Sequence, residues 1–226
     1  MAYIEGRTVH DADSHVMELP DKILEYLAPS AVDAFIKTAN KPITVSQDLQ
    51  NAIALQSDPS FRAEDGAQLM LRKNHLALGA FEAKDRPKTL DLLGITSQLV
   101  FTTAALGNFG LDEKDPALAQ AAALAHNRMN SDFCSVDPRL LATGYVPPSD
   151  LDAAPGIAIE AIELGCRGLV VPSACPTHHS PSHRGLDPLW ALLEEAGLPV
   201  LFHVGGEEKM AAAYANNGGE RGLDFH

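Results

Sequence analysis

Most apolar residues of this chain gather in short uninterrupted runs, which longer segments of mixed character separate. Runs such as GLVV and PVLF contain no alternating polar positions, which is typical of strands buried on both faces of a parallel sheet. The pattern predicts strands over residues 8–16, 95–101, 140–146, 167–171 and 199–204.

Helix signals fill the intervals between these strands. Asp115 and Asp187 each precede a proline, which is the arrangement expected of an N-cap followed by the first helical residue. Gly165 and Gly197 stand where helices are expected to end. Helices are predicted over residues 19–38, 66–79, 115–131, 151–164 and 187–197, and residues 40–86 form a long helical excursion.

The alternation of strands and helices predicts an α/β fold with a parallel sheet covered by helices. Two architectures have this rhythm, an open doubly wound sheet and a closed (β/α)₈ barrel. No G-x-G-x-x-G motif follows the first predicted strand, which counts against an open sheet that binds a dinucleotide. An open-sheet nucleotide-binding protein remains an alternative, and it would be stabilised by nucleotide, an effect we do not expect.

The first predicted strand carries the most concentrated chemistry of the chain, in the sequence DADSH at residues 11–15. Side chains two residues apart on a strand share a face, so Asp11, Asp13 and His15 are predicted to point the same way. Three ionisable groups on an inward face are costly without a counter-charge, and a divalent ion near Asp13 and His15 would supply it. Asp11 is expected to have a structural role as a hydrogen-bond acceptor.

His203 ends the last predicted strand, before Gly205 and Gly206. Strand ends in one layer of a barrel face the same opening, so His203 is predicted to join Asp13 and His15. A carboxylate with two imidazoles suits zinc or a similar divalent ion. The alternatives are a turn-forming pair at residues 13 and 15 and a hydrogen-bonded core histidine at residue 203.

Composition and charge narrow the class of partner. The 226 residues carry 17 Lys and Arg against 30 Asp and Glu, a formal net charge of −13, which repels nucleic acid. No apolar run approaches the roughly 18 residues of a membrane span, so no membrane partner is expected. Three widely spaced cysteines favour a reducing cytoplasm over a disulfide framework, and the expected partner is a small-molecule substrate.

Several stretches together resemble the amidohydrolase superfamily, in the amidohydrolase-2 branch that includes aminocarboxymuconate-semialdehyde decarboxylase and the resorcylate-type decarboxylases. The resemblance covers about residues 8–16 and 87–206, and the last stretch is its most specific part. The resembling residues are DADSH at 11–15, LLGI at 92–95, PRL at 138–140, LGCRG at 164–168 and DPLWALLEEAGLPVLFHVGG at 187–206.

The resemblance implies a TIM (β/α)₈ barrel of the metal-dependent hydrolase type, with one metal held by Asp13, His15 and His203. Members often begin with H-x-H, so Asp13 is a departure from the usual pattern. A strand-six His and a strand-eight Asp, which the family uses for metal binding and proton transfer, have no counterpart before His226. The expectation is therefore one incomplete barrel domain over residues 1–226, C-terminally truncated, with about five of eight β/α units and the proton-transfer Asp beyond the chain.

The expected activity is a metal-dependent hydrolase acting on a small organic, possibly carboxylated aromatic, substrate. A non-oxidative metal-dependent decarboxylase and an inactive fragment are the alternatives. Zinc is the expected metal, with manganese as a second choice, and a homodimer is expected by resemblance only.

Four residues are candidates for substrate binding. His179 and His183 lie in the segment after the fourth predicted strand, where barrels form their pockets. Arg62 and Arg72 lie in the excursion and could pair with a substrate carboxylate. For each of the four, a solvated surface residue is the alternative.

Overall fold

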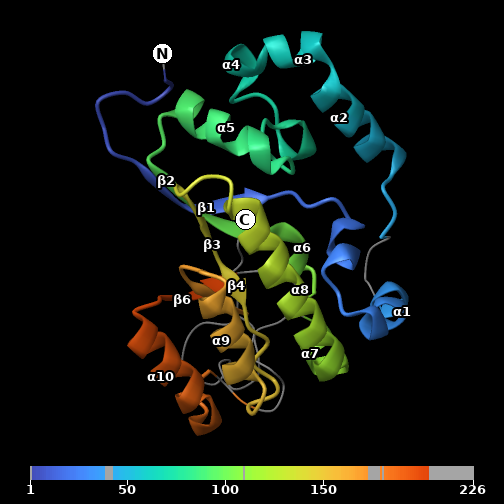
Figure 1. Ribbon diagram of the computed structural model, residues 1–226, viewed down its shortest axis with the longest axis vertical. Coiled ribbons are helices and arrows are strands. Elements are labelled where there is room, and N and C mark those ends of the chain that lie inside the picture. Colours follow the sequence, from blue (N-terminus) through green and yellow to red (C-terminus); the bar gives the residue numbers. More distant parts are fainter. Residues whose placement is uncertain (1, 39–42, 109, 173–178, 180, 204–226) are drawn as a thin grey trace, which may run out of the picture.

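The computed structural model describes residues 2–38, 43–108, 110–172, 179 and 181–203. Within these ranges the chain alternates strands with helices, as the sequence predicted, and every strand pair is parallel. Figure 1 shows the strands running through the middle of the molecule, with helices packed around them.

The described residues contain six strands in two sheets, and within each sheet consecutive strands pair. One sheet has the order β1-β2-β3 and the other the order β4-β5-β6. The strands are β1 (His10–Val16), β2 (Ser97–Thr102), β3 (Leu140–Ala142), β4 (Gly144–Tyr145), β5 (Leu169–Pro172) and β6 (Val200–His203). A doubly wound sheet reverses its strand order at a switch point, whereas a barrel adds strands consecutively, so the observed order is that of a barrel.

The two sheets are joined where one continuous run of chain changes partner. Thr143 N donates to Val100 O at 3.0 Å, on the β2 side, and Gly144 N donates to Gly168 O at 3.0 Å, on the β5 side. The predicted strand over 140–146 is thus β3 and β4 together. A Cβ on Gly144 would lie 2.7 Å from Leu169 Cδ2 and 2.8 Å from Ala161 Cβ, so glycine is needed there for close packing. Among the described residues the strands form an arc of barrel units that does not close.

Three of the predicted helices are found near their expected positions, as α8 (Pro116–Cys134), α9 (Ala154–Glu163) and α10 (Asp187–Ala196). The Asp115 carboxylate accepts a hydrogen bond from Leu118 N at 3.0 Å, which is the predicted N-cap. Gly197 ends α10 in the left-handed conformation at φ 63°.

Two helix predictions are wrong in detail. Residues 19–38 do not form one helix but a 3₁₀ turn, η1 (Lys22–Glu25), followed by α1 (Pro29–Thr38). The break precedes Pro29, whose ring disfavours helical backbone at the residue before it. The predicted helix over 66–79 is reduced to α4 (Asp65–Gln68) and η2 (Asn74–Leu76), and Asn74 has a positive φ of 51° that interrupts any longer helix.

Short helices make up the excursion between α1 and α5 (Arg86–Leu93), and the predicted strand over 95–101 follows it as β2. Figure 1 shows these helices together at the top of the view, on the side of β1 and β2 away from α10. They are α2 (Gln47–Ser57), α3 (Pro59–Ala63), α4, η2 and η3 (Ala83–Asp85).

Two apolar clusters within the described part of the chain hold these elements together. The larger one lies between the strands and helices α8, α9 and α10, and includes Val100, Val146 and Leu169 at 0% exposure. The smaller one packs η1 and α1 against α8, through Phe35 and Leu118 among others.

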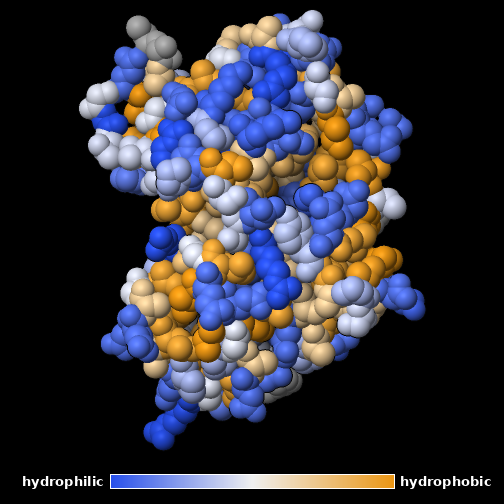
Figure 2. All heavy atoms as spheres, viewed as in Figure 1, coloured by the Kyte–Doolittle hydropathy of each residue, from blue (hydrophilic) through white to orange (hydrophobic). Residues whose placement is uncertain are grey.

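The space-filling view shows polar and apolar residues mixed over the surface (Figure 2). No helix in the described part of the chain is both long and apolar enough to cross a bilayer.

Candidate metal centre

An irregularity in β1 sets the geometry of the candidate site. Asp11 pairs with Gln98 and Ser14 with Val100, so β1 has one residue more than β2 between these two points. Such a bulge breaks the two-residue alternation of side chains. The prediction that Asp11 shares a face with Asp13 and His15 is therefore wrong.

Asp11 belongs instead to a buried polar network behind β1. Its Oδ2 accepts a hydrogen bond from Gln98 Nε2 at 3.1 Å, in line with the structural role expected for it. Gln98 Oε1 in turn accepts from Arg86 Nε at 2.9 Å. The Arg86 guanidinium also donates to Ser14 Oγ and, at 3.1 Å, to His15 O, so it holds the Ser14 side chain and the His15 carbonyl group of β1.

The structure brings Asp13, His15 and His203 together at the carboxyl ends of β1 and β6. Asp13 Oδ1 lies 3.4 Å from His15 Nε2 and 3.3 Å from His203 Nε2. The two Nε2 atoms lie 3.3 Å apart. The Asp13 side chain is 74% exposed, whereas those of His15 and His203 are 25% and 15% exposed, so the cluster opens to solvent on the carboxylate side.

The spacing of these three atoms fits a shared ion. Donors bound at about 2.0–2.1 Å with tetrahedral angles are separated by about 3.3–3.4 Å. The observed separations of 3.3–3.4 Å match that value on all three sides. The donor set, one carboxylate oxygen and two imidazole nitrogens, is also of the kind that zinc and manganese accept.

Burial and neighbouring rings prepare His15 for such a role. Its ring stacks on Phe101 with centroids 5.6 Å apart, and Phe101 also contacts the His203 ring at 5.2 Å. Burial lowers the pKa of His15 below its ordinary value, while the nearby Asp13 carboxylate partly opposes this and His203 adds to it. The imidazole is thus held neutral near pH 7, which is the form that binds a metal.

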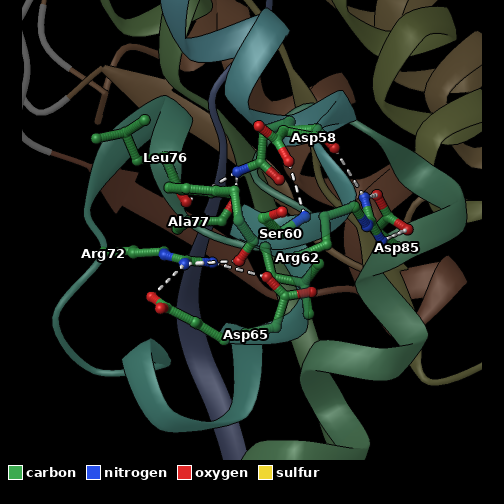
Figure 3. A network of polar contacts seen from close by, with 12 residues as sticks. Asp58, Ser60, Arg62, Asp65, Arg72, Leu76, Ala77 and Asp85 are labelled. Carbon is green, nitrogen blue, oxygen red and sulfur yellow. Dashed lines mark hydrogen bonds and ion pairs between the residues drawn. The ribbon is translucent and has the colours of Figure 1, made fainter.

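Arg62 and Arg72 lie in the excursion, where each pairs with a carboxylate of the chain itself (Figure 3). Arg62 Nη1 and Nη2 donate to both oxygens of Asp85, at 2.8 and 2.7 Å. Arg72 Nη1 donates to Asp65 Oδ1 at 2.8 Å, and its guanidinium lies over the Phe61 ring. These contacts give the two arginines a structural function and lend no support to their predicted role in substrate binding.

His179 and His183 lie close to each other, with ring centroids 5.1 Å apart. His183 Nδ1 accepts a hydrogen bond from Gly185 N at 3.0 Å, which caps the 3₁₀ turn η4 (Arg184–Leu186). Residues 173–178, with Cys175 and His178, lie outside the described residues. The structure therefore places the two histidines beside each other at the start of η4.

Prediction from the sequence missed three residues that contact His15 directly. Phe101 stacks on the ring, Arg86 bonds the backbone oxygen, and Thr103 Oγ1 lies 3.2 Å from Nδ1. A signal existed for Phe101 and Thr103, because both stand at the carboxyl end of the predicted second strand, where barrel sites are built. No signal pointed to Arg86, whose partners lie up to 72 residues away in the sequence.

Comparison with known families gives one match. The model of a family described as amidohydrolase matches residues 74–225, a range that contains His203 but not Asp13 or His15. A search of curated proteins found no match to this chain.

Solved structures of similar fold come from several bacteria, and their sequence identity to this chain is low. An amidohydrolase from Mycobacterium avium subsp. paratuberculosis K-10 has a TM-score of 0.64 at 22% identity, covering 89% of this chain and 60% of that one. A 5-carboxyvanillate decarboxylase from Novosphingobium aromaticivorans DSM 12444, with bound manganese and 3-methoxy-4-hydroxy-5-nitrobenzoic acid, has a TM-score of 0.55 at 16% identity, covering 92% and 53%. A 2,6-dihydroxybenzoate decarboxylase from Rhizobium has a TM-score of 0.53 at 17% identity, covering 87% and 50%.

The chain spans 50–60% of the length of these three proteins.

Proposed function

Because the chain belongs to the amidohydrolase family, we propose that Asp13, His15 and His203 bind one divalent metal ion and serve a metal-dependent enzyme acting on a small organic substrate. The observation that carries the proposal is the triangle of donor atoms, 3.3–3.4 Å on each side. Three polar groups so close together repel one another unless a proton or a cation lies between them.

A divalent ion at this site would supply a Lewis acid, which polarises a carbonyl or carboxylate group and acidifies water. The ligands leave that acidity largely intact. Asp13 contributes one negative charge, whereas His15 and His203 bind as neutral imidazoles. One net positive charge therefore remains, which favours a substrate that carries or develops negative charge.

The positions of the ligands and their neighbours suit their proposed roles at the metal site. Asp13 lies on the solvent side with its side chain 74% exposed, which would leave the approach for a small molecule open. Phe101 packs under both imidazole rings and keeps water from their inner sides. The Arg86 guanidinium fixes the backbone of His15 from behind, so that the ligand atoms keep their spacing.

Hydrolysis of a C–N or C–O bond is the reaction we propose first, since a Lewis acid with an open side can activate water as well as bind a carbonyl group. Non-oxidative decarboxylation of an aromatic acid is the second candidate. Its support is that two of the solved structures with similar folds are decarboxylases of aromatic acids. In both reactions the proton-transfer group would come from residues other than the three ligands.

Zinc and manganese both fit the donor set. Zinc is favoured by the two imidazoles and by the near-tetrahedral spacing, and manganese is the ion bound in the 5-carboxyvanillate decarboxylase.

We also propose a cytoplasmic location, because the two described cysteines, Cys134 and Cys166, are free buried thiols. A homodimer and the absence of nucleic-acid and membrane partners complete the proposal.

Metal stoichiometry of the full chain tests the site. The chain is freed of metal with a chelator, titrated with zinc or manganese, and compared with His203→Ala and with His10→Ala as the matched control. His10 lies at the other end of β1, where its Nδ1 bonds Ser97 Oγ at 2.7 Å. The expected result is one ion per chain for wild type and His10→Ala, and none for a folded His203→Ala.

Catalysis is tested on the metal-loaded chain with two panels of small aromatic compounds. Amides and esters report hydrolysis, and hydroxybenzoic acids report release of carbon dioxide. Metal binding without turnover in either panel would favour the inactive-fragment alternative. A wild-type chain that binds no more metal than His203→Ala would refute the proposed site.

A further inference from the structure

We propose that Thr103 is a positioning residue that fixes the tautomer of His15, and that Glu18 holds Thr103 in place for this task. The inference deepens the proposed function and rests on it, because it takes His15 to be a metal ligand. It concerns residues of β1, of the segment directly after it and of the turn after β2, none of which is among the proposed ligands except His15 itself.

The hydrogen bonds of Thr103 determine which way its hydroxyl proton points. Thr103 Oγ1 lies 2.8 Å from Val16 O and 3.2 Å from His15 Nδ1. A carbonyl oxygen can only accept, so the hydroxyl group donates to Val16 O. The third neighbour, Met17 Sδ, lies at 3.6 Å and is a weaker acceptor.

With its proton committed to Val16, the Thr103 oxygen can act toward His15 only as an acceptor. His15 Nδ1 must then carry the hydrogen, and in a neutral imidazole Nε2 is left with a lone pair. Nε2 is the atom that lies 3.4 Å from Asp13 Oδ1 and 3.3 Å from His203 Nε2. Thr103 thus selects the form of His15 whose lone pair faces the proposed metal position.

The other tautomer could donate from Nε2 to Asp13 Oδ1 when no ion is bound, but it is unsuited to metal binding and leaves Nδ1 without a donor. Its Nε2–H would point into the triangle of ligand atoms and exclude an ion from it. Its bare Nδ1 would face a hydroxyl oxygen whose proton is already donated to Val16 O. Metal-binding histidines commonly depend on a partner at the second ring nitrogen in this way.

Glu18 fixes the backbone that carries Thr103. Its Oε2 accepts hydrogen bonds from Thr103 N at 3.1 Å and from Ala104 N at 3.0 Å. These residues begin α6 (Thr103–Leu106), a single turn that is too short to be stable by itself. The carboxylate therefore anchors the turn that places the Thr103 hydroxyl beside His15.

Metal affinity tests the assignment with two variants of the full chain. Thr103→Val keeps the branched shape but removes the hydroxyl, and Thr103→Ser keeps the hydroxyl. Zinc affinity, measured by competition with a coloured chelator, is expected to fall about 10–100-fold in Thr103→Val and to stay within about 3-fold of wild type in Thr103→Ser. Glu18→Ala is expected to lower affinity as well, and Glu18→Gln, whose amide oxygen can accept the same two bonds, to preserve it.

The tautomer is read separately in the metal-free protein. Long-range ¹H–¹⁵N correlation spectra distinguish Nδ1–H from Nε2–H, and the His15 signals are identified by their loss in His15→Gln. Wild type and Thr103→Ser are expected to show Nδ1–H, and Thr103→Val a shift toward Nε2–H. A destabilised but otherwise ordinary site would lose stability without this change of tautomer.

A wild-type spectrum with the proton on Nε2 would overturn the proposal, and so would Thr103→Val with unchanged tautomer and affinity. Should Thr103→Val not fold, Thr103→Ala takes its place, and the wild-type spectrum still decides. A chain that binds no ion would refute the proposed function. The role of Thr103 would still be tested separately, because the tautomer spectrum is recorded without metal.

Discussion

The Nε2 atoms of His15 and His203 lie 3.3 Å apart although 188 residues separate them along the chain. The two residues belong to different three-stranded sheets, one ending in β1 and the other in β6. They can meet only because the chain runs from one sheet into the other at Thr143 and the combined strands curve. The site is therefore a product of the barrel-like arc, since no local motif brings its parts together.

The charge of Asp13 is expected to matter more for metal binding than its shape. Asp13→Asn keeps the size of the side chain but removes its negative charge, so zinc affinity should fall by at least about 100-fold, beyond what outer partners of a ligand contribute. Asp11→Asn is the control for loss of a nearby charge and of strand support, because its amide oxygen can still accept from Asp13 N, as Asp11 Oδ1 does at 3.1 Å, while the bond from Gln98 Nε2 is lost. Equal affinity losses in both variants would place the effect in the strand and not in the ligand.

Arg62 is expected to stabilise the excursion and to have no part in the metal site. Its bidentate pair with Asp85 lowers the pKa of that carboxyl, because the guanidinium hydrogen-bonds to the ionised form. Arg62→Lys cannot form both bonds, and urea unfolding should show a loss of about 1–3 kcal/mol. Lys84→Ala, which removes an exposed ion pair with Glu82, should cost less than about 1 kcal/mol. A fall in zinc affinity with Arg62→Lys would contradict this structural role.

Glu18 is expected to make stability fall as the pH rises. Burial raises the pKa of Glu18 from 4.5 to about 7, while hydrogen bonds from Thr103 N and Ala104 N act against the rise. The folded chain thus holds a proton that the unfolded chain has lost between pH 4.5 and 7, so the contribution of Glu18 is most favourable below pH 4.5. Its full loss by pH 8 corresponds to about 3 kcal/mol.

Comparison with Glu18→Gln isolates this effect. The variant cannot ionise at residue 18. As the pH rises from 4 to 8, its free energy of unfolding minus that of wild type should therefore increase by about 3 kcal/mol. Urea unfolding at the two pH values measures the difference, with Glu25→Gln as the control on an exposed carboxylate paired to Lys22. A constant difference between wild type and Glu18→Gln would show that Glu18 keeps an ordinary pKa.

His126 is expected to make stability fall as the pH drops, opposite to the effect of Glu18. Burial lowers its pKa from 6.5 to about 3, and its Nδ1 is buried with no hydrogen-bond partner among the described residues. The unfolded chain takes up a proton there below pH 6.5 and the folded chain does not, so stability falls as the pH drops, by about 1.4 kcal/mol per pH unit. His126→Gln should lack this slope. Between pH 7.5 and pH 5, wild type should therefore lose about 2 kcal/mol of its free energy of unfolding relative to the variant, measured by urea unfolding. Identical slopes for wild type and His126→Gln would contradict the prediction.

The sequence predicted the candidate site where residues able to bind a metal stand at the ends of predicted strands. His203 closes an apolar run, and Asp13 and His15 close the first strand, so their meeting followed from barrel geometry. The N-cap at Asp115 and the glycine at residue 197 were equally local signals, and both were found as predicted.

Other features depend on contacts that no local pattern reveals. Arg62 and Arg72 pair with carboxylates at residues 85 and 65, which only the folded excursion brings near. The change of partner at Thr143 follows from curvature of the strands, and the residue pattern there is the same as in an uninterrupted strand. The bulge in β1 was hidden for the same reason, because DADSH fits a regular alternation equally well.

That bulge makes the number of residues in β1 as important as their identity. Asp11 lies on the same side of β1 as the buried Ser14, and on the side opposite His15, because one additional residue is accommodated after Asp11. Removing a single residue such as Ala12 would let β1 and β2 pair without interruption, and Asp11 and Ser14 would keep their partners, but the segment that carries Asp13 would lose its extra length and the Asp13 carboxylate its position. Related chains can therefore exchange side chains in this strand far more freely than they can gain or lose a position.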